Sequence, residues 1–236
     1  MYYPGFYFDP TYVLVLIGVV LSLIASAKVK STFNKYSNVH NSRGITGAEA
    51  AHRVLQQAGV HDVRIEHVAG NLTDHYDPRS KVLRLSDSVY GSTSVAAVGV
   101  AAHECGHAIQ HANGYVPLKF RGILVPVANI GAKISWPLIL LGLIISSNSS
   151  WILIELGILA FSLSVLFSLV TLPVEFNASK RAIRSIADSG MMYGNEIVAA
   201  KKVLNAAALT YVASAASSVL QLLRLILLTR GRRRND

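Results

Sequence analysis

Long apolar runs constrain this chain more than any other feature of its sequence. Residues 10–27 carry no charge, and 122–145 and 151–172 form two further apolar runs, the first interrupted by Lys133. Each run is long enough to cross a bilayer as a helix. The composition agrees, because only 15% of the residues are charged, against about 25% in a soluble domain. The sequence therefore predicts a mainly α membrane protein.

The charges beside these runs predict how the chain is threaded. Lys28, Lys30 and Lys35 follow the first run, whereas a cleaved signal peptide carries its positive charges before the apolar stretch. By the positive-inside rule, the N-terminus lies outside and residues 28–121 face the cytoplasm of a bacterial plasma membrane. The net charge of +9 then mostly reflects the membrane topology, and no nucleic-acid partner is expected.

The last apolar stretch, 203–228, leaves two interpretations open. Its length favours a fourth span, and its many small residues suit close packing on neighbouring helices. A span would put the arginine-rich tail at 229–236 outside, against the positive-inside rule. The alternative is a helix that lies on the membrane or on the soluble domain.

Residues 28–121 predict a small α+β domain. Thr46 and Glu49 have the spacing of a capping box, which predicts a helix at 50–58. A second helix is predicted at 95–112, where Ser94 precedes a run of small apolar residues. Alternation and turn residues predict the other elements, two short strands at 63–68 and 81–86 and a turn at 71–79.

The predicted second helix contains an H-E-x-x-H motif, His103-Glu104-Cys105-Gly106-His107. Residues four apart lie on one helix face, so both imidazoles can reach one metal ion. Zn²⁺ is the expected ion, and Glu104 is placed to accept a proton from the water that the metal acidifies. Cys105 lies on another side of the helix and is predicted to be a packing residue.

A zinc site of this kind needs a third protein ligand. His111 is about 12 Å from His103 along the helix axis, too far to share the ion, and is expected to be a helix-end residue. Gln110 and Asn113 also break the longer metzincin pattern. Glu175 is the best candidate, because two spans separate it from His107 and return it to the same membrane face. Asp188 passes the same test but lies further along the chain.

Several stretches resemble a known family when taken together, and they cover most of the chain: 74–79, 83–86, 99–108, 173–179 and 207–213. The combination resembles the YugP family of membrane zinc metallopeptidases, which is similar in plan to the HtpX and CAAX-prenyl membrane peptidases. The resemblance implies a gluzincin-like site in a zincin-like domain, with His103, His107 and Glu175 as metal ligands and Glu104 as the base. It also implies that the edge strand that pairs with substrate is 81–86.

One position departs from the pattern of those relatives. They have an Asp four residues after the ligand Glu, where it buttresses a ligand His, and this chain has Ser179. A hydroxyl can orient the imidazole but supplies no charge to raise its basicity. The residue that stabilises the oxyanion is left open among Tyr193, Arg184 and Tyr211. The segment 74–79 is read equally well as part of a substrate cleft or as a structural turn.

The predicted organisation has six parts, an N-terminal anchor (1–27), a cytoplasmic zincin-like domain (28–121), a transmembrane hairpin (122–172), a helical segment with the third ligand (173–202), an apolar helix (203–228) and a basic tail (229–236). The predicted function is a membrane-embedded zinc endopeptidase acting on peptides or membrane proteins. An intramembrane protease would need the motif helix at bilayer depth. A non-catalytic, zinc-stabilised membrane scaffold or pseudoprotease is the alternative from another class, and Ser179 is the feature that favours it.

Overall fold

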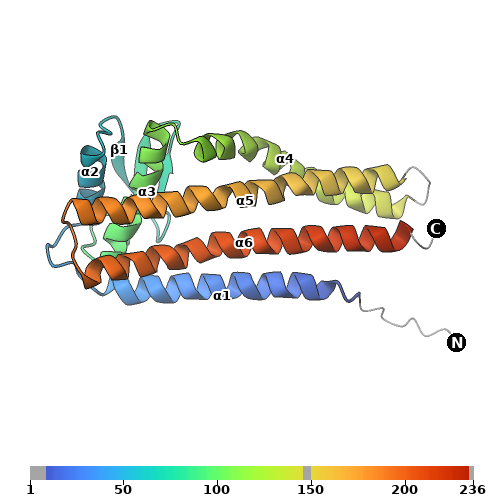
Figure 1. The fold of residues 1–236 in the computed structure, drawn as a ribbon, viewed down its shortest axis with the longest axis horizontal. Coiled ribbons are helices and arrows are strands. Elements are labelled where there is room, and N and C mark those ends of the chain that lie inside the picture. The colour runs from blue at the N-terminus through green and yellow to red at the C-terminus, as the bar shows by residue number, and fades with distance from the viewer. Residues whose placement is uncertain (1–8, 146–149, 234–236) are drawn as a thin grey trace. The chain divides into compact units, whose positions relative to one another are not determined.

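The computed structural model describes residues 9–145 and 150–233, which fold into helices and one small sheet (Figure 1). In chain order the elements are α1 (Tyr12–Ser37), α2 (Gly47–Gln57), β1 (Arg64–Val68), β2 (His75–Asp77), β3 (Val82–Ser86), α3 (Val95–Ala112), α4 (Val116–Ile144), α5 (Ser150–Asp188) and α6 (Asn195–Arg233). Among the described residues, α1, α4, α5 and α6 are long and apolar enough to cross a membrane. The predicted membrane α fold with a small α+β part is therefore confirmed. The aromatic cluster before residue 9, the polar tip at 146–149 and the end of the basic tail lie outside the described residues.

The chain divides into two compact units. The mixed unit contains residues 25–123 and 170–212, and therefore all three strands together with α2 and α3. The helical unit contains the rest of the described chain, which is the first half of α1, most of α4, the first half of α5 and the second half of α6.

Two short helices form the centre of the mixed unit. The capping box before α2 is present as predicted, with the Thr46 side chain accepting from the Glu49 amide and the Glu49 carboxylate accepting from the Thr46 amide. Ser94 caps α3 in the same way, accepting from the amide of Ala97. α3 packs against α2, β2 and β3, and small residues let it lie buried on most of its surface (Figure 1). Cys105 is fully buried there, so its predicted packing role is confirmed.

The sheet corrects two predictions. Its strand order is β1-β3-β2, with β1 parallel and β2 antiparallel to β3. The strand at 82–86 is therefore central and paired on both sides, so the expectation that it forms the edge was wrong. The edge strand is β2, inside the segment 71–79 that was predicted to be a turn. Its three residues between turn signals are too few for a visible alternation.

The two last helices extend well beyond their apolar runs into the mixed unit. α5 continues through Pro173 to Asp188, and α6 begins at Asn195 after a short connection. In the second half of α5 one stripe of side chains is fully buried, Val174, Ala178, Ala182 and Ile186. The four-residue spacing places this stripe on a single helix face, so α5 contributes one side to the core of the unit.

Small residues bring the helices of the helical unit into close contact. A Cβ added at Gly131 would lie 2.5 Å from the Ala160 carbonyl oxygen, so α4 and α5 touch at their backbones. The Ser217 hydroxyl of α6 donates to the carbonyl oxygen of Gly18 in α1 at 2.9 Å. Close packing through small residues is typical of membrane helices, and α6 has the length and apolar composition of a span.

Candidate metal centre

Two histidines one helical turn apart begin the site. α3 places His103 and His107 on the same face, with their ring centroids 4.9 Å apart and the rings nearly perpendicular. Each side chain is 14% exposed, so both imidazoles lie mostly inside the protein. The predicted spacing of the motif is therefore realised on a continuous helix.

The third group comes from α5. The Glu175 carboxylate is only 3% exposed, and its Oε2 atom lies 3.3 Å from His103 Nε2 and 3.5 Å from His107 Nε2. The three residues form a group whose ligand atoms lie within 4.8 Å of one another, and it could hold a metal ion. Asp188, the other acid that the topology allowed, is exposed at the end of α5.

The donor atoms fit a zinc ion. Ligands held at about 2.0–2.2 Å around a tetrahedral ion lie about 3.3–3.6 Å from one another, close to the two distances from Glu175 Oε2. That oxygen is buried and has no hydrogen-bond partner among the described residues, although a buried carboxylate oxygen normally has one. Burial opposes protonation of His107, but the nearby carboxylates of Glu175 and Glu104 outweigh it and raise its pKa. The site therefore favours a positive charge at this position.

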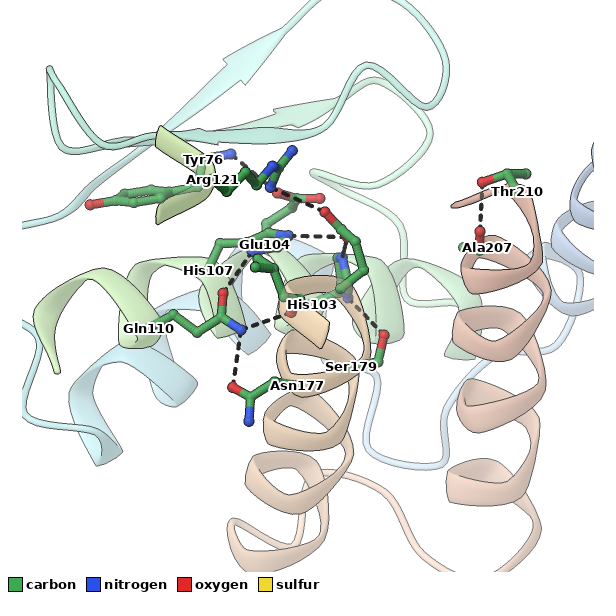
Figure 2. Close-up of polar contacts among 12 residues, drawn as sticks. Tyr76, His103, Glu104, His107, Gln110, Arg121, Asn177, Ser179, Ala207 and Thr210 are labelled. Atoms are coloured by element: carbon green, nitrogen blue, oxygen red, sulfur yellow. Dashed lines mark hydrogen bonds and ion pairs between the residues drawn. The ribbon is translucent and has the colours of Figure 1, made fainter. Parts of the chain in front are cut away.

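Gln110 fixes which nitrogen of His107 faces the site. Its amide nitrogen, fully buried, donates to the carbonyl oxygen of Val174 at 2.8 Å and to Asn177 Oδ1 at 3.0 Å (Figure 2). This leaves Gln110 Oε1, an acceptor, 3.1 Å from His107 Nδ1. Nδ1 must then be the donor, so the neutral ring presents an unprotonated Nε2, as metal binding requires.

Ser179 does the same for the other ring. Its hydroxyl lies 3.1 Å from His103 Nδ1 and accepts from it when Nε2 is free for a metal (Figure 2). The hydroxyl thus occupies the orienting position that the sequence suggested for residue 179. Both imidazoles are oriented by neutral oxygens, one from α3 itself and one from α5.

Arg121 forms an ion pair with the second carboxylate oxygen of Glu175. Its guanidinium donates to Glu175 Oε1 at 3.2 Å, which leaves Oε2 turned toward the imidazoles (Figure 2). Tyr211 also interacts with the Glu175 carboxylate. Of the other donors suggested from the sequence, Tyr193 is exposed and bonded to Arg43, and Arg184 is exposed.

Glu104 lies on the neighbouring face of α3, beside the imidazoles. Its Oε2 atom accepts a hydrogen bond of 3.1 Å from the amide of Tyr76, which belongs to the edge strand β2 (Figure 2). Burial raises the pKa of the Glu104 carboxyl, while the adjacent imidazoles oppose that rise. One carboxylate oxygen of Glu104 is thus held by the edge strand of the sheet.

Three residues that contact the cluster were not predicted from the sequence, namely Gln110, Arg121 and Tyr76. Gln110 had been considered only as a break in the metzincin pattern, although its position three residues after His107 puts it on the same helix face. Arg121 and the Tyr76 amide gave no local signal. His111 is a helix-end residue as expected, and its Nδ1 lies 2.9 Å from the Tyr76 hydroxyl.

Comparison with known proteins agrees with this geometry. The family described as "Putative neutral zinc metallopeptidase" matches residues 11–230. The chain belongs to this family. It is also 48% identical over 215 residues to the "Putative membrane protease YugP" of Bacillus subtilis (strain 168), covering 91% of this chain and 94% of that protein. No solved structure matches the chain significantly.

Family membership accounts for the metal and the setting. The cofactor of a zinc metallopeptidase is Zn²⁺. Among the described residues, His103, His107 and Glu175 form a cluster that could hold this ion. The four apolar helices and the membrane protease relative make this a multi-pass membrane protein. The suspected family resemblance is therefore confirmed.

Proposed function

We propose that this protein is a membrane zinc endopeptidase that hydrolyses peptide bonds of peptide or membrane-protein substrates, with His103, His107 and Glu175 as the metal ligands. The observation that carries the proposal is the placement of Glu175 Oε2, buried and unbonded, 3.3 and 3.5 Å from the two Nε2 atoms. Zinc supplies Lewis-acid polarisation of the scissile carbonyl and acidifies water at neutral pH.

The residues around the metal position divide the remaining work. Glu104 takes a proton from the attacking water and returns it to the leaving amine, while the Tyr76 amide holds its other oxygen. Gln110 and Ser179 keep the two imidazoles in the ligating tautomer, and Arg121 orients Glu175. Tyr211, next to Glu175, is the candidate donor to the oxyanion that develops on the substrate carbonyl.

The edge strand suggests where a substrate lies. Because β2 borders the site and pairs only with β3 in the sheet, an extended peptide can run beside β2 rather than beside the central strand. α3 packs inside the mixed unit and is not one of the four membrane-length helices. This favours cleavage at a membrane surface over cleavage within the bilayer, and the lysines after the first apolar run favour the cytoplasmic surface.

Substitution of the base tests the proposal against its alternative. Glu104→Gln should lower the rate of peptide cleavage by about 10²–10⁴-fold and leave the zinc content unchanged, because Glu104 is not a metal ligand in this scheme. Cleavage of a peptide library, followed by mass spectrometry, gives the rate, and elemental analysis gives the zinc. Glu66→Gln, which changes a half-buried acid on β1 outside the metal cluster, is the matched control.

The opposite result would favour a zinc-stabilised scaffold. Ser179 is the observation that keeps this candidate open, since a neutral hydroxyl partners His103 where related peptidases have a carboxylate. A scaffold would bind zinc and fold normally, yet Glu104→Gln would then change no measurable property of the protein.

A further inference from the structure

A groove on the mixed unit lies apart from the metal cluster. It has a volume of about 790 Å³ and is formed by α1 and α6, which lie side by side in Figure 1, with the ring of Phe176 from α5. The polar part of its lining consists of three lysines and four uncharged hydrogen-bonding residues, Lys28, Lys35, Lys202, Ser31, Thr32, Tyr36 and Asn205. None of these residues takes part in the proposed peptidase chemistry.

The charge in this groove is one-sided. Lys28, Lys35 and Lys202 line it, and no Asp or Glu does. Within the described chain none of the three ammonium groups has an ion pair with a carboxylate, and Lys35 lies only over the ring of Tyr36. Three like charges that line one groove without a carboxylate partner favour an anion that approaches them from outside.

The groove also changes character along its length. α1 and α6 run in opposite directions, so Lys35 lies toward the same end as Lys202, whereas Lys28 lies toward the end with Leu209 and Val212. Leu209 and Val212 are exposed, as is Phe176. The lining therefore has two of its three lysines at one end, and at the other end it has Lys28 together with the apolar residues Leu209 and Val212.

The apolar end continues into the membrane-spanning sequence. Lys28 directly follows the uncharged run 10–27, and the exposed Leu23 and Ile24 precede it on α1. A lysine at this position can keep its ammonium group at the headgroup level while its stem lies along apolar surface. The order of the lining thus matches that of a lipid, whose charged headgroup is followed by acyl chains.

We propose that this groove is a binding site for an anionic phospholipid, with the phosphate between the three lysines and the acyl chains along Leu209, Val212 and Phe176. Basic pockets between membrane helices bind anionic headgroups in this way. A free phosphate would leave the apolar wall unused. A bound lipid would also contact the turn of α5 that carries Glu175, since Phe176 is the next residue.

Lipid titration of the full-length protein tests the proposal directly. Phosphatidylglycerol and phosphatidylcholine with identical acyl chains are added to the protein in a mild non-ionic detergent. Native mass spectrometry counts the bound lipid, and thermal unfolding reports stabilisation. Phosphatidylglycerol should bind about tenfold more tightly than phosphatidylcholine and should raise the melting temperature more. Equal binding of the two lipids would overturn the proposal.

Variants locate the site. Changing Lys28, Lys35 and Lys202 together to Gln should remove the preference for phosphatidylglycerol, and changing the same three to Arg should keep it. The matched control replaces three exposed lysines outside the groove, Lys119, Lys180 and Lys201, with Gln. An equal loss in the control would show a general charge effect and refute the groove. If the Gln variant does not fold, the comparison of the two lipids on the unaltered protein still decides.

Soluble anions separate a lipid from a free phosphate. Inorganic phosphate and glycerol 3-phosphate should stabilise the protein at least about tenfold less, at equal concentration, than dispersed phosphatidylglycerol. Equal stabilisation by inorganic phosphate would mean that the site takes a soluble phosphate and that the lipid assignment is wrong. Each readout is lipid binding or melting, so the outcome does not depend on peptidase activity.

Discussion

The two helices that meet at the metal position are held in very different ways. α3, with His103 and His107, is surrounded by α2 and two strands, and most of its residues are buried. The second half of α5, with Glu175, contributes one buried stripe and leaves residues such as Phe176 and Lys180 exposed. The imidazole pair is therefore positioned by a packed core, whereas the carboxylate depends on a few specific contacts between α5 and its neighbours.

This difference suggests where the metal site is vulnerable. The contacts that tie α5 to α3 are the approach of Gly106 to Ala178 and the hydrogen bonds of Gln110 and Ser179. If α5 is the weaker partner, changes at these contacts should affect zinc binding more than they affect the folding of α2, α3 and the sheet.

Removing the carboxylate should have the largest effect. Glu175→Gln keeps the size of the side chain but replaces the ligand oxygen's charge, so zinc affinity should fall by more than about 100-fold, beyond what loss of an outer contact costs. The stabilisation that saturating zinc gives, about 2.7 kcal/mol at 100 times the dissociation constant, should disappear at that zinc concentration. Competition with a chromophoric chelator measures the affinity, and thermal unfolding with and without zinc measures the stabilisation.

Asp188→Asn is the matched control for this change. It removes an acid from the same helix at an exposed position, so zinc affinity should stay within about twofold, as for a surface substitution without a specific contact. If Glu175→Gln bound zinc as tightly as the unaltered protein, the assignment of the third ligand would be wrong.

Crowding the contact between α3 and α5 should have the next largest effect. A Cβ at Gly106 would lie 2.6 Å from the Ala178 carbonyl oxygen, so Gly106→Ala must push α5 away from α3. We expect a loss of about 1–3 kcal/mol in the free energy of unfolding, as in overpacked cores, together with weaker zinc binding. Chemical denaturation and zinc competition provide the two measurements.

Gly99→Ala on the same helix separates this clash from a general effect of alanine. Its Cβ would meet the Cβ of Ala200 at 3.4 Å, an ordinary contact, and alanine favours a helix over glycine by about 1 kcal/mol. The control should therefore be neutral or stabilising with normal zinc affinity. Equal losses at both positions would contradict the special role of the contact between α3 and α5.

The sequence predicted α3 and the elements around it better than it predicted the contacts of α5. Capping residues and small-residue patterning are local signals, and they identified the helix at 50–58, the motif helix and the strands at 63–68 and 81–86 correctly. Counting spans also singled out Glu175 with a signal that required no contact. Asp188 passed the same count and was ranked second only because it lies further along the chain; the structure places Glu175 beside the imidazoles and leaves Asp188 exposed.

What the sequence could not supply depends on contacts between distant segments. The strand at 75–77 exists because it pairs with β3 and borders α3, and its three residues carry too little pattern to be recognised. Nothing in the local sequence marks Arg121 and Gln110, because their roles depend on contacts with α5. The central place of 82–86 in the sheet likewise follows from pairing, which a strand's own residues do not specify.

Removing a hydrogen-bond partner of the imidazoles should lower zinc affinity by a smaller amount that still distinguishes the two helices. Gln110→Leu leaves the buried Nδ1 of His107 without an acceptor and removes the bond from α3 to the Val174 carbonyl of α5. Zinc affinity should fall by about 10–100-fold, the usual result of losing such a partner. Zinc competition measures it, and an unchanged affinity would mean that the tautomer of His107 is not set by Gln110.

Ser179→Ala completes this comparison with the smallest expected loss. Ser179 is only partly buried, so water can replace its hydroxyl next to His103 Nδ1, and zinc affinity should fall by less than about tenfold. Ser179→Asp should instead tighten zinc binding, because a carboxylate increases the basicity of the imidazole that it accepts from. If Ser179→Asp weakened zinc binding while the protein stayed folded, a neutral partner would be a requirement of this site rather than a tolerated substitution.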